Sequence, residues 1–214
     1  MTELLFIRHG ETDWNLQQRF QGQIDVPLNA TGLAQAARLA QRLAADRHDA
    51  LFSSDLVRAQ QTAAPLAAAW GLLPTLVPGL REQSFGVLEG LDVPTIKQRH
   101  AELWQQWLQH RGDFALPGGE SLRQLHVRVI DTVRELAAAA GGRRLAVVTH
   151  GGVLDMLWRT AHGLSLDGLR ACEIPNTGLN RLRWAGDKLH IDGWADDGHL
   201  AGLPSQPTTK AGER

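Results

Sequence analysis

Two short, continuously apolar runs in this chain each lead into a histidine. Residues 4–7 are followed within two positions by His9, and residues 145–148 are followed in the same way by His150. Apolar runs of this length that end near glycine are typical of strands buried on both faces of a parallel sheet. In open α/β sheets, ligands bind just beyond the carboxyl ends of the strands. The repeated pattern therefore predicts that His9 and His150 meet at one edge of such a sheet.

The remaining periodicity alternates between strands and helices. Further strands are predicted at residues 50–53, 73–77, 178–184 and 188–194, and helices at residues 31–44, 56–70, 93–110, 122–140 and 153–162. The last two strands flank a Gly-Asp turn and are expected to form a hairpin. We therefore predict an α/β fold of three layers, α/β/α, with a mostly parallel central sheet flanked by helices.

Two helix starts carry polar residues suited to capping. Ser121 and Gln124 form a capping-box pattern, and Ser54 or Asp55 is expected to cap the helix that contains Arg58. Arg58 then lies in the first turn, where a cation opposes the helix dipole. An anionic group close to Arg58 would explain its position.

Length and charge narrow the classes of function. The chain has 214 residues, enough for one substantial core, and we expect a single domain over residues 1–203 with a disordered tail at 204–214. Its 22 Lys and Arg residues nearly balance 23 Asp and Glu residues, which argues against nucleic acid and membrane surfaces as partners. A single cysteine, Cys172, and the absence of a secretion-signal pattern favour a cytoplasmic location.

Two irregular segments are candidates for functional loops. Residues 17–29 are polar and rich in Gln, and residues 80–90 combine Glu82 with several glycines and have no clear period. The apolar region that follows, residues 93–112, is entered through Gly90 and left through Gly112 and could act as a lid. Its tryptophans serve equally well as core residues.

These separate segments together resemble one known family, the histidine phosphatase superfamily in its phosphoglycerate mutase-like branch. The resemblance covers most of the chain. Each motif alone would be weak evidence for the family, but together and in this order they are strong evidence. The motifs are Arg8-His9-Gly10-Glu11 with Trp14-Asn15, Ser54-Asp55-Leu56 with Arg58-Ala59 and Thr62-Ala63, Glu82 with Phe85-Gly86 and Glu89-Gly90, Pro117-Gly118-Gly119-Glu120-Ser121, and His150-Gly151. The resemblance implies a phosphoglycerate mutase-like fold and a phosphomonoesterase that forms a phosphohistidine.

The resemblance also implies a role for each matching residue. His9 is the expected nucleophile and Glu82 the proton donor, while Arg8, Arg58 and His150 surround the phosphoryl oxygens. The expected phosphate-binding set continues with Asn15, Gln21, Gly22 and Gly151. Arginine suits this role because its planar fork binds phosphate oxygens in pairs, and cations beside His9 favour its neutral, nucleophilic form. Arg58→Ala is expected to be crippled in turnover but well folded.

Within the family, hydrolases and mutases must be told apart. Mutases usually have Arg after the acidic residue, Tyr before the next Gly, Gly-Trp in the first loop, and paired arginines in an insertion. This chain has Gln83, Phe85 and Gly22-Gln23 at the first three places and no Arg-Arg pair between residues 89 and 117. These differences favour a phosphatase acting on a small phosphorylated metabolite. A cofactor-dependent phosphoglycerate mutase and a non-catalytic phosphoanion-binding module remain alternatives.

No metal or cofactor is implied by the sequence. The other seven histidines lack the spacing of metal ligands and are interpreted as surface or core residues. Four apolar residues could form a wall around the leaving group, although core packing is an equal explanation for them: Phe20, Ile24, Trp104 and Trp107. The identity of the substrate and the oligomeric state stay open.

Overall fold

A computed structural model describes residues 1–204, and its centre is a six-stranded sheet in the order β3-β2-β4-β1-β5-β6. The strands are β1 (Thr2–Arg8), β2 (Ala50–Ser53), β3 (Thr75–Leu76), β4 (Arg144–Thr149), β5 (Leu179–Ala185) and β6 (Lys188–Asp196). Strands β3, β2, β4 and β1 run parallel, and β5 and β6 form an antiparallel hairpin against β1. The mostly parallel sheet and the hairpin are both confirmed. Strand β3 is shorter than predicted because Pro74 and Pro78 flank it and cannot donate to a ladder.

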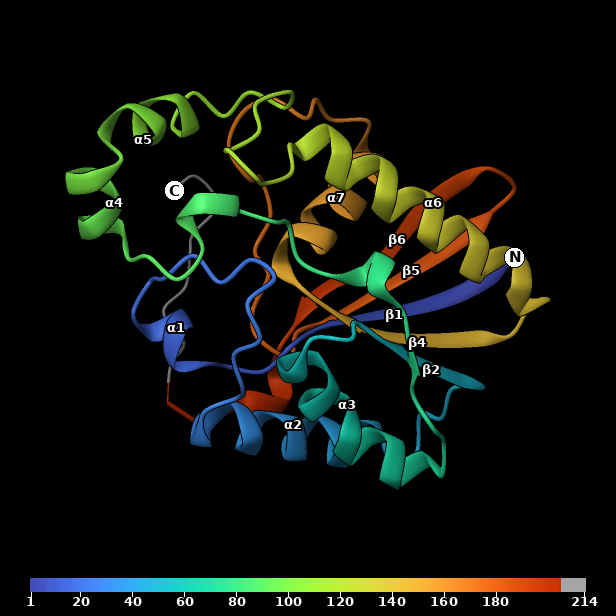
Figure 1. Cartoon of the computed structure of the whole chain (residues 1–214). Helices are drawn as coiled ribbons and strands as arrows, with labels where there is room; N and C mark the ends of the chain where they lie inside the picture. The colour runs from blue at the N-terminus through green and yellow to red at the C-terminus, as the bar shows by residue number, and fades with distance from the viewer. Residues whose placement is uncertain (205–214) are drawn as a thin grey trace.

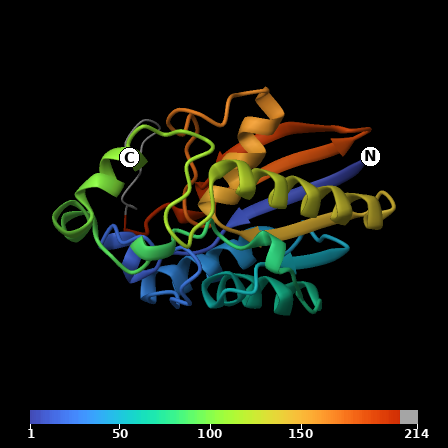
Figure 2. The same cartoon turned by 45° about the horizontal axis from the view of Figure 1, so that its top comes forward.

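Alternate side chains of β1 supply two separate cores. Leu4 and Phe6 pack into the core beneath α6 (Leu122–Ala140) and α7 (Gly151–His162). Leu5 and Ile7 pack into the core on the opposite face, beneath α2 (Ala30–Leu43) and α3 (Val57–Trp70). Figures 1 and 2 show these helix pairs on opposite sides of the sheet. A strand covered on both faces has no polar side to present, which explains the continuous apolar runs.

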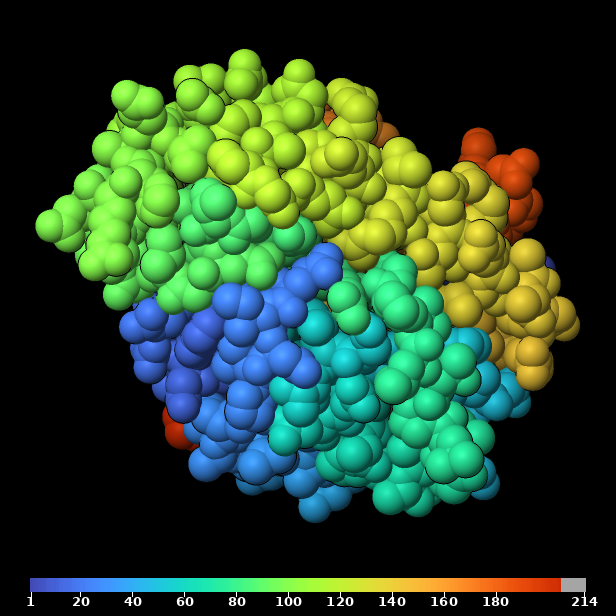
Figure 3. Space-filling view, in the orientation of Figure 1, coloured from blue at the N-terminus to red at the C-terminus, as the bar shows by residue number. Residues whose placement is uncertain are grey.

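The short elements gather at the carboxyl edge of the parallel strands (Figure 1). They are α1 (Asp13–Leu16), η1 (Pro78–Leu80), η2 (Gly86–Leu88), α4 (Val93–Arg99), α5 (Ala101–Trp107) and η3 (Gly198–Leu200). Figure 3 shows the blue N-terminal loop lying against the green segment that follows β3. Residues of α1, α4 and α5 line the cavity in front of the two histidine-bearing strand ends.

The predicted single helix over residues 93–110 is wrong, because the structure has two helices there. His100 leaves helical geometry with φ −134° and ψ 42°, ending α4 and beginning α5. The spacing of Ile96, Leu103 and Trp107 is compatible with one straight helix, so periodicity alone could not locate the break.

The two predicted caps have different outcomes. Ser121 and Gln124 form the predicted capping box of α6. The predicted cap of α3 is wrong, because its N-cap is Leu56, whose own side chain makes no capping bond. The N–H of Val57, the first residue of the helix, donates to Oδ1 of Asp25 at 2.6 Å. The hydroxyl of Ser54 is instead 2.8 Å from the Nε2 nitrogen of His150.

No helix in the described part of the chain combines the length and hydropathy needed to cross a bilayer. The tail predicted to be disordered at residues 204–214 lies, apart from Pro204, outside the described residues.

Candidate active site

The two histidines meet at the carboxyl edge of the sheet. Strands β1 and β4 pair in parallel with Arg8 opposite Thr149, so the next residue on each strand is His9 or His150. Their ring centroids are 5.2 Å apart. Both side chains are buried. Residues 141 positions apart in the chain are thus neighbours because their strands are adjacent.

The backbone around His9 sets the tautomer of its ring. The Nδ1 nitrogen is 2.7 Å from the carbonyl oxygen of Gly10, which can only accept, so Nδ1 carries the proton. The Nε2 nitrogen is left with its lone pair. Burial, and then the positive charges of Arg58 and Arg8, hold the pKa of His9 well below the usual 6.5. Its imidazole is therefore neutral at neutral pH, with burial the largest single cause.

Arg58 is fully buried and connects three parts of the site. Its Nε donates to Nδ1 of His150 at 3.2 Å, Nη1 donates to the carbonyl of Ile24 at 2.9 Å, and Nη2 donates to that of Gly22 at 2.7 Å. Burial lowers the pKa of its guanidinium to about 10, while nearby carboxylates, Glu82 above all, oppose the shift. Arg58 therefore stays charged, and the carboxylates supply the anionic surroundings that its place in the first helical turn calls for.

The hydrogen bond between Arg58 and His150 settles the tautomer of the His150 ring. Because Arg58 can only donate, Nδ1 of His150 accepts, and Nε2 carries the proton that it donates to Ser54 at 2.8 Å. Burial, Arg58 and His9 lower the pKa of His150 well below 6.5. Both nitrogens of His150 thus have protein partners.

A cavity of about 400 Å³ opens onto this cluster. Every predicted site residue except His150 lines it, and the lining set comprises Arg8, His9, Asn15, Gln21, Gly22, Arg58, Glu82 and Gly151. Arg8 is anchored by an Nη1 hydrogen bond of 2.5 Å to the carbonyl of Ile174. The carboxamide oxygen of Asn15 accepts from Thr12, so its NH₂ group is the part available to a ligand. The cavity therefore offers donors from Arg8, Asn15 and Arg58 around His9.

Glu82 lies over the N-terminus of α7. The backbone N–H of Gly152 donates to its two carboxylate oxygens at 2.9 and 3.2 Å, and the N–H of Gln83 donates to one of them at 2.9 Å. A Cβ at Gly152 would come within 2.2 Å of the carboxylate, so any larger residue there would displace Glu82 from this position. The positive end of the helix dipole and these two donors hold the carboxylate in one place.

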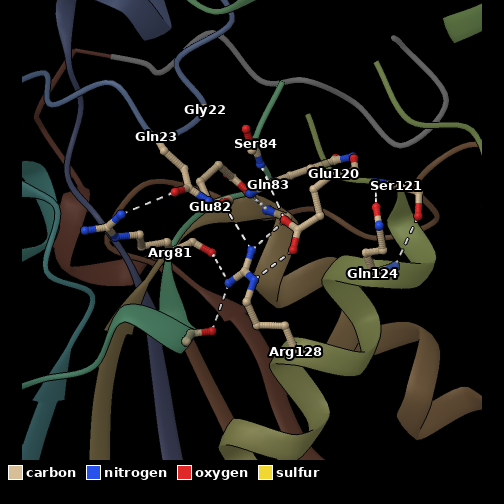
Figure 4. Close-up of polar contacts among 12 residues, drawn as sticks. Gly22, Gln23, Arg81, Glu82, Gln83, Ser84, Glu120, Ser121, Gln124 and Arg128 are labelled. Carbon is tan, nitrogen blue, oxygen red and sulfur yellow. Dashed lines mark hydrogen bonds and ion pairs between the residues drawn. The ribbon is translucent and has the colours of Figure 1, made fainter. Parts of the chain in front are cut away.

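A second layer of contacts fixes the backbone of the Glu82 segment (Figure 4). Arg128 on α6 donates to both carboxylate oxygens of Glu120 at 2.9 and 2.7 Å, and also to the carbonyls of Gly79, Arg81 and Glu82. Of these five hydrogen bonds, three tie the Glu82 segment to a long helix and two hold Glu120. Sequence reasoning missed Arg128, since one arginine on a mixed helix gives no signal of a structural role.

Glu89 explains the need for glycine at position 22. Gly22 has φ +50°, and a Cβ there would come within 2.0 Å of Oε1 of Glu89. That carboxylate oxygen accepts from the N–H groups of Gln23 and Phe85 at 3.1 and 2.8 Å. The loop is thereby held with the Gly22 carbonyl directed at Arg58.

One side of the cavity is aromatic. Phe20 lies 5.0 Å from Phe85, 6.4 Å from Trp104 and 5.8 Å from Trp107, measured between ring centroids. All four line the cavity and also pack in a small core. The fourth residue of the predicted wall, Ile24, does not line the cavity and is 38% exposed, so that prediction is wrong for Ile24.

The cavity lining also contains polar residues that sequence reasoning missed. Asn176 donates from Nδ2 to the carbonyl of His9 at 2.8 Å, and Asp155, Arg159 and Arg170 line the cavity near Gly151. Asn176 follows Pro175 in the turn before β5, a pattern that indicates a turn but not a contact.

Comparison with known proteins places the chain in a family. Residues 4–197 match the Histidine phosphatase superfamily (branch 1). The chain belongs to the histidine phosphatase superfamily. The predicted family resemblance is confirmed over nearly the whole chain.

Three related proteins show the range of this superfamily. The chain is 36% identical to a metal-independent phosphoserine phosphatase of Arabidopsis thaliana, over 95% of this chain and 85% of that protein. It is 35% identical to a probable phosphoglycerate mutase of Enterobacter sp. (strain 638), over 91% and 90% of the two chains. The structure of a mycobacterial glucosyl-3-phosphoglycerate phosphatase in complex with VO3 superposes with a TM-score of 0.78 and 30% identity, over 90% of this chain and 98% of that chain. This histidine phosphatase is therefore an enzyme of the phosphatase type, with the predicted α/β fold.

Proposed function

We propose that this histidine phosphatase hydrolyses small phosphomonoesters through a phosphohistidine formed on Nε2 of His9. The observation that carries the proposal is the state of His9: a buried, neutral imidazole whose Nδ1 proton is held by Gly10 and whose free Nε2 lies among Arg8 and Arg58. Such a nitrogen is an activated nucleophile that splits a difficult hydrolysis into two displacements.

The first displacement forms the phosphoenzyme. The lone pair of His9 Nε2 attacks phosphorus, the ester P–O bond breaks, and protonated Glu82 gives its proton to the leaving alkoxide. Arg8, Arg58 and the NH₂ group of Asn15 bind the equatorial oxygens, where the charge of the transition state is spread. Gly151 contributes at the N-terminus of α7, a position suited to anions.

The second displacement releases inorganic phosphate. Ionised Glu82 takes a proton from water, the water oxygen attacks phosphorus, and the P–N bond breaks with its electron pair returning to His9. In the proposed scheme, His150 acts by orienting Arg58, to which it is hydrogen-bonded, and by closing the space behind His9. Gln21 and Gly22 belong to the loop that receives the other hydrogen bonds of Arg58.

A labelling experiment tests the covalent intermediate. After mixing with an excess of a ³²P-labelled phosphomonoester and rapid quenching, we expect acid-labile, base-stable label on the peptide that contains His9. His9→Ala should carry no label, and His190→Ala, which removes an exposed histidine on β6, should label like the wild type. Tight binding of the ester without label on the wild type would contradict the hydrolase and favour the phosphoanion-binding module.

The mutase is the second candidate, and the relative of Enterobacter with that name supports it. Against it, the cavity contains Gln83, whose amide donates to the carbonyl of Glu120 at 2.7 Å, and Phe85 in the aromatic side, where mutases usually have Arg and Tyr. With 3-phosphoglycerate and catalytic 2,3-bisphosphoglycerate, we expect release of phosphate to exceed formation of 2-phosphoglycerate at least tenfold. Interconversion as fast as hydrolysis would establish the mutase.

We further propose that residues 1–203 form one domain and that the enzyme acts in the cytoplasm. The family match over residues 4–197 supports the first statement. The single thiol, Cys172, is buried and unpaired, which fits a reducing compartment.

A further inference from the structure

Beside the phosphoryl site lies a cluster of Asp155, Arg159 and Arg170. Arg159 is a structural residue, because every N–H of its guanidinium has an acceptor. Its Nε donates to Asp155 at 3.1 Å, and its terminal nitrogens donate to the carbonyls of residues 165, 167, 168 and 169. These bonds hold the segment of residues 163–170 against α7 and so fix the position of the backbone that carries the Arg170 side chain.

The same segment is also tied to the residues that follow α5. The N–H of Gly168 donates to the carbonyl of His110 at 2.8 Å, and the carboxylate of Asp167 accepts from the N–H of Gly112 at 2.7 Å. Residues 165–169, which lead directly into Arg170, are therefore bonded both to α7 and to the residues after α5.

Arg170 differs from Arg159 in its partners. Within residues 1–204 its guanidinium makes a single ion pair, a contact of 3.9 Å between Nε and Asp155, and that buried Nε has no hydrogen bond. Its side chain is 26% exposed and lines the cavity. Because Asp155 is also paired with Arg159, the cluster retains one net positive charge.

The terminal nitrogens of Arg170 lie beside the place where the leaving group must be. A Cβ built on Gly151 would lie 3.6 and 3.7 Å from the two terminal nitrogens of Arg170 and 3.7 Å from Oε2 of Glu82. The space beside Gly151 is therefore within reach of both the carboxylate of Glu82 and the guanidinium of Arg170. Within residues 1–204, the terminal nitrogens of that guanidinium have no hydrogen-bond acceptor. A leaving oxygen within reach of Glu82 places the adjoining carbon atoms next to Arg170.

We propose that Arg170 binds a carboxylate on the leaving group, so that the enzyme selects phosphomonoesters that carry a carboxylate two carbon atoms from the ester oxygen. This inference rests on the proposed function. A guanidinium binds a carboxylate through two parallel charge-assisted hydrogen bonds. One guanidinium with Asp155 beside it suits a singly charged carboxylate better than a second, doubly charged phosphate.

Other cationic groups of the cavity do not fill this role. Arg8 and Arg58 face the phosphoryl group in the proposed mechanism. Arg19 donates to Gln17 and to the carbonyl of Gly90, and Arg111 is exposed at the mouth, 5.8 Å from the ring of Phe114.

The test compares pairs of esters that differ at the carboxylate. O-phospho-L-serine and O-phosphoethanolamine share an ester and an amine, and 3-phosphoglycerate and glycerol 3-phosphate form a second pair. We expect the wild type to prefer the carboxylate-bearing member of each pair. Arg170→Gln should lower kcat/KM for that member about 10- to 100-fold, chiefly through KM, and change the other member less than threefold. Arg170→Lys should recover part of the loss.

Arg111→Gln is the matched control, since it removes the same charge from the mouth of the same cavity. It should leave the preference for the carboxylate-bearing ester in place. If Arg111→Gln lowered this preference as much as Arg170→Gln does, the preference would come from the overall positive charge of the cavity rather than from Arg170. The proposal would be overturned if Arg170→Gln lowered kcat/KM equally for both members of a pair, or lowered it for neither.

Binding separates this inference from the proposed function. In the His9→Ala background, which cannot form the phosphoenzyme, calorimetry with O-phospho-L-serine should show weaker binding when Arg170→Gln is added. Binding of O-phosphoethanolamine should not change. If the wild type fails to turn over any ester, the hydrolase fails, while this binding difference still decides the role of Arg170.

Discussion

Glu82→Gln is expected to lower kcat for an alkyl phosphomonoester by about 10²- to 10⁴-fold. An alkoxide is a poor leaving group and needs the proton of Glu82, which an amide cannot supply. The amide oxygen of Gln can still accept from the N–H groups of Gly152 and Gln83, so the loop should keep its geometry. Steady-state kinetics and thermal unfolding of the variant check both statements.

The leaving group distinguishes the chemistry of Glu82 from a structural role. Nitrophenolate leaves without a proton, so p-nitrophenyl phosphate should still phosphorylate His9 in Glu82→Gln. The second displacement lacks its base, and we expect a burst of nitrophenol followed by slow turnover, with the phosphoenzyme accumulating. Glu135→Gln, at an exposed position of α6, is the control. A uniform loss on alkyl and aryl esters without a burst would remove Glu82 from proton transfer.

The arrangement of the two histidines could be predicted from the sequence, but the hydrogen bonds of their rings could not. Two buried parallel strands must bring their carboxyl ends to one edge, and local apolar pattern is enough to identify them. The ring of His150, however, bonds to Arg58 on α3 and to Ser54 just before it. Those partners depend on where α3 is packed, and no local pattern encodes that.

Arg128 and Arg170 escaped prediction for a related reason. Arg128 holds the Glu82 segment from α6, and Arg170 is presented by a segment that Arg159 anchors. In the sequence each is one arginine among many on a helix or in a loop, where solvent exposure is the ordinary interpretation. Their roles follow from contacts between elements that are far apart in the chain.

Arg58→Ala is expected to lose at least 10²- to 10³-fold in kcat, since one lost donor to a developing charge has about that effect. The sequence alone predicts that this variant stays well folded, and the burial of Arg58 changes that expectation. Truncation leaves the carbonyls of Gly22 and Ile24 and Nδ1 of His150 without their donor. An unsatisfied buried polar group costs roughly 1–3 kcal/mol. We therefore expect a clear drop in Tm alongside the loss of activity.

Arg58→Lys separates the two effects. Lysine keeps a positive charge, but its single ammonium group cannot reach three acceptors and a phosphoryl oxygen as the planar guanidinium does. We expect Tm between those of the wild type and Arg58→Ala, with kcat still reduced at least tenfold at a temperature where the variant is fully folded. Arg123→Ala, which removes an exposed arginine of α6, should affect neither quantity. Near-normal turnover by folded Arg58→Lys would contradict the proposal that the phosphoryl group needs the guanidinium of Arg58.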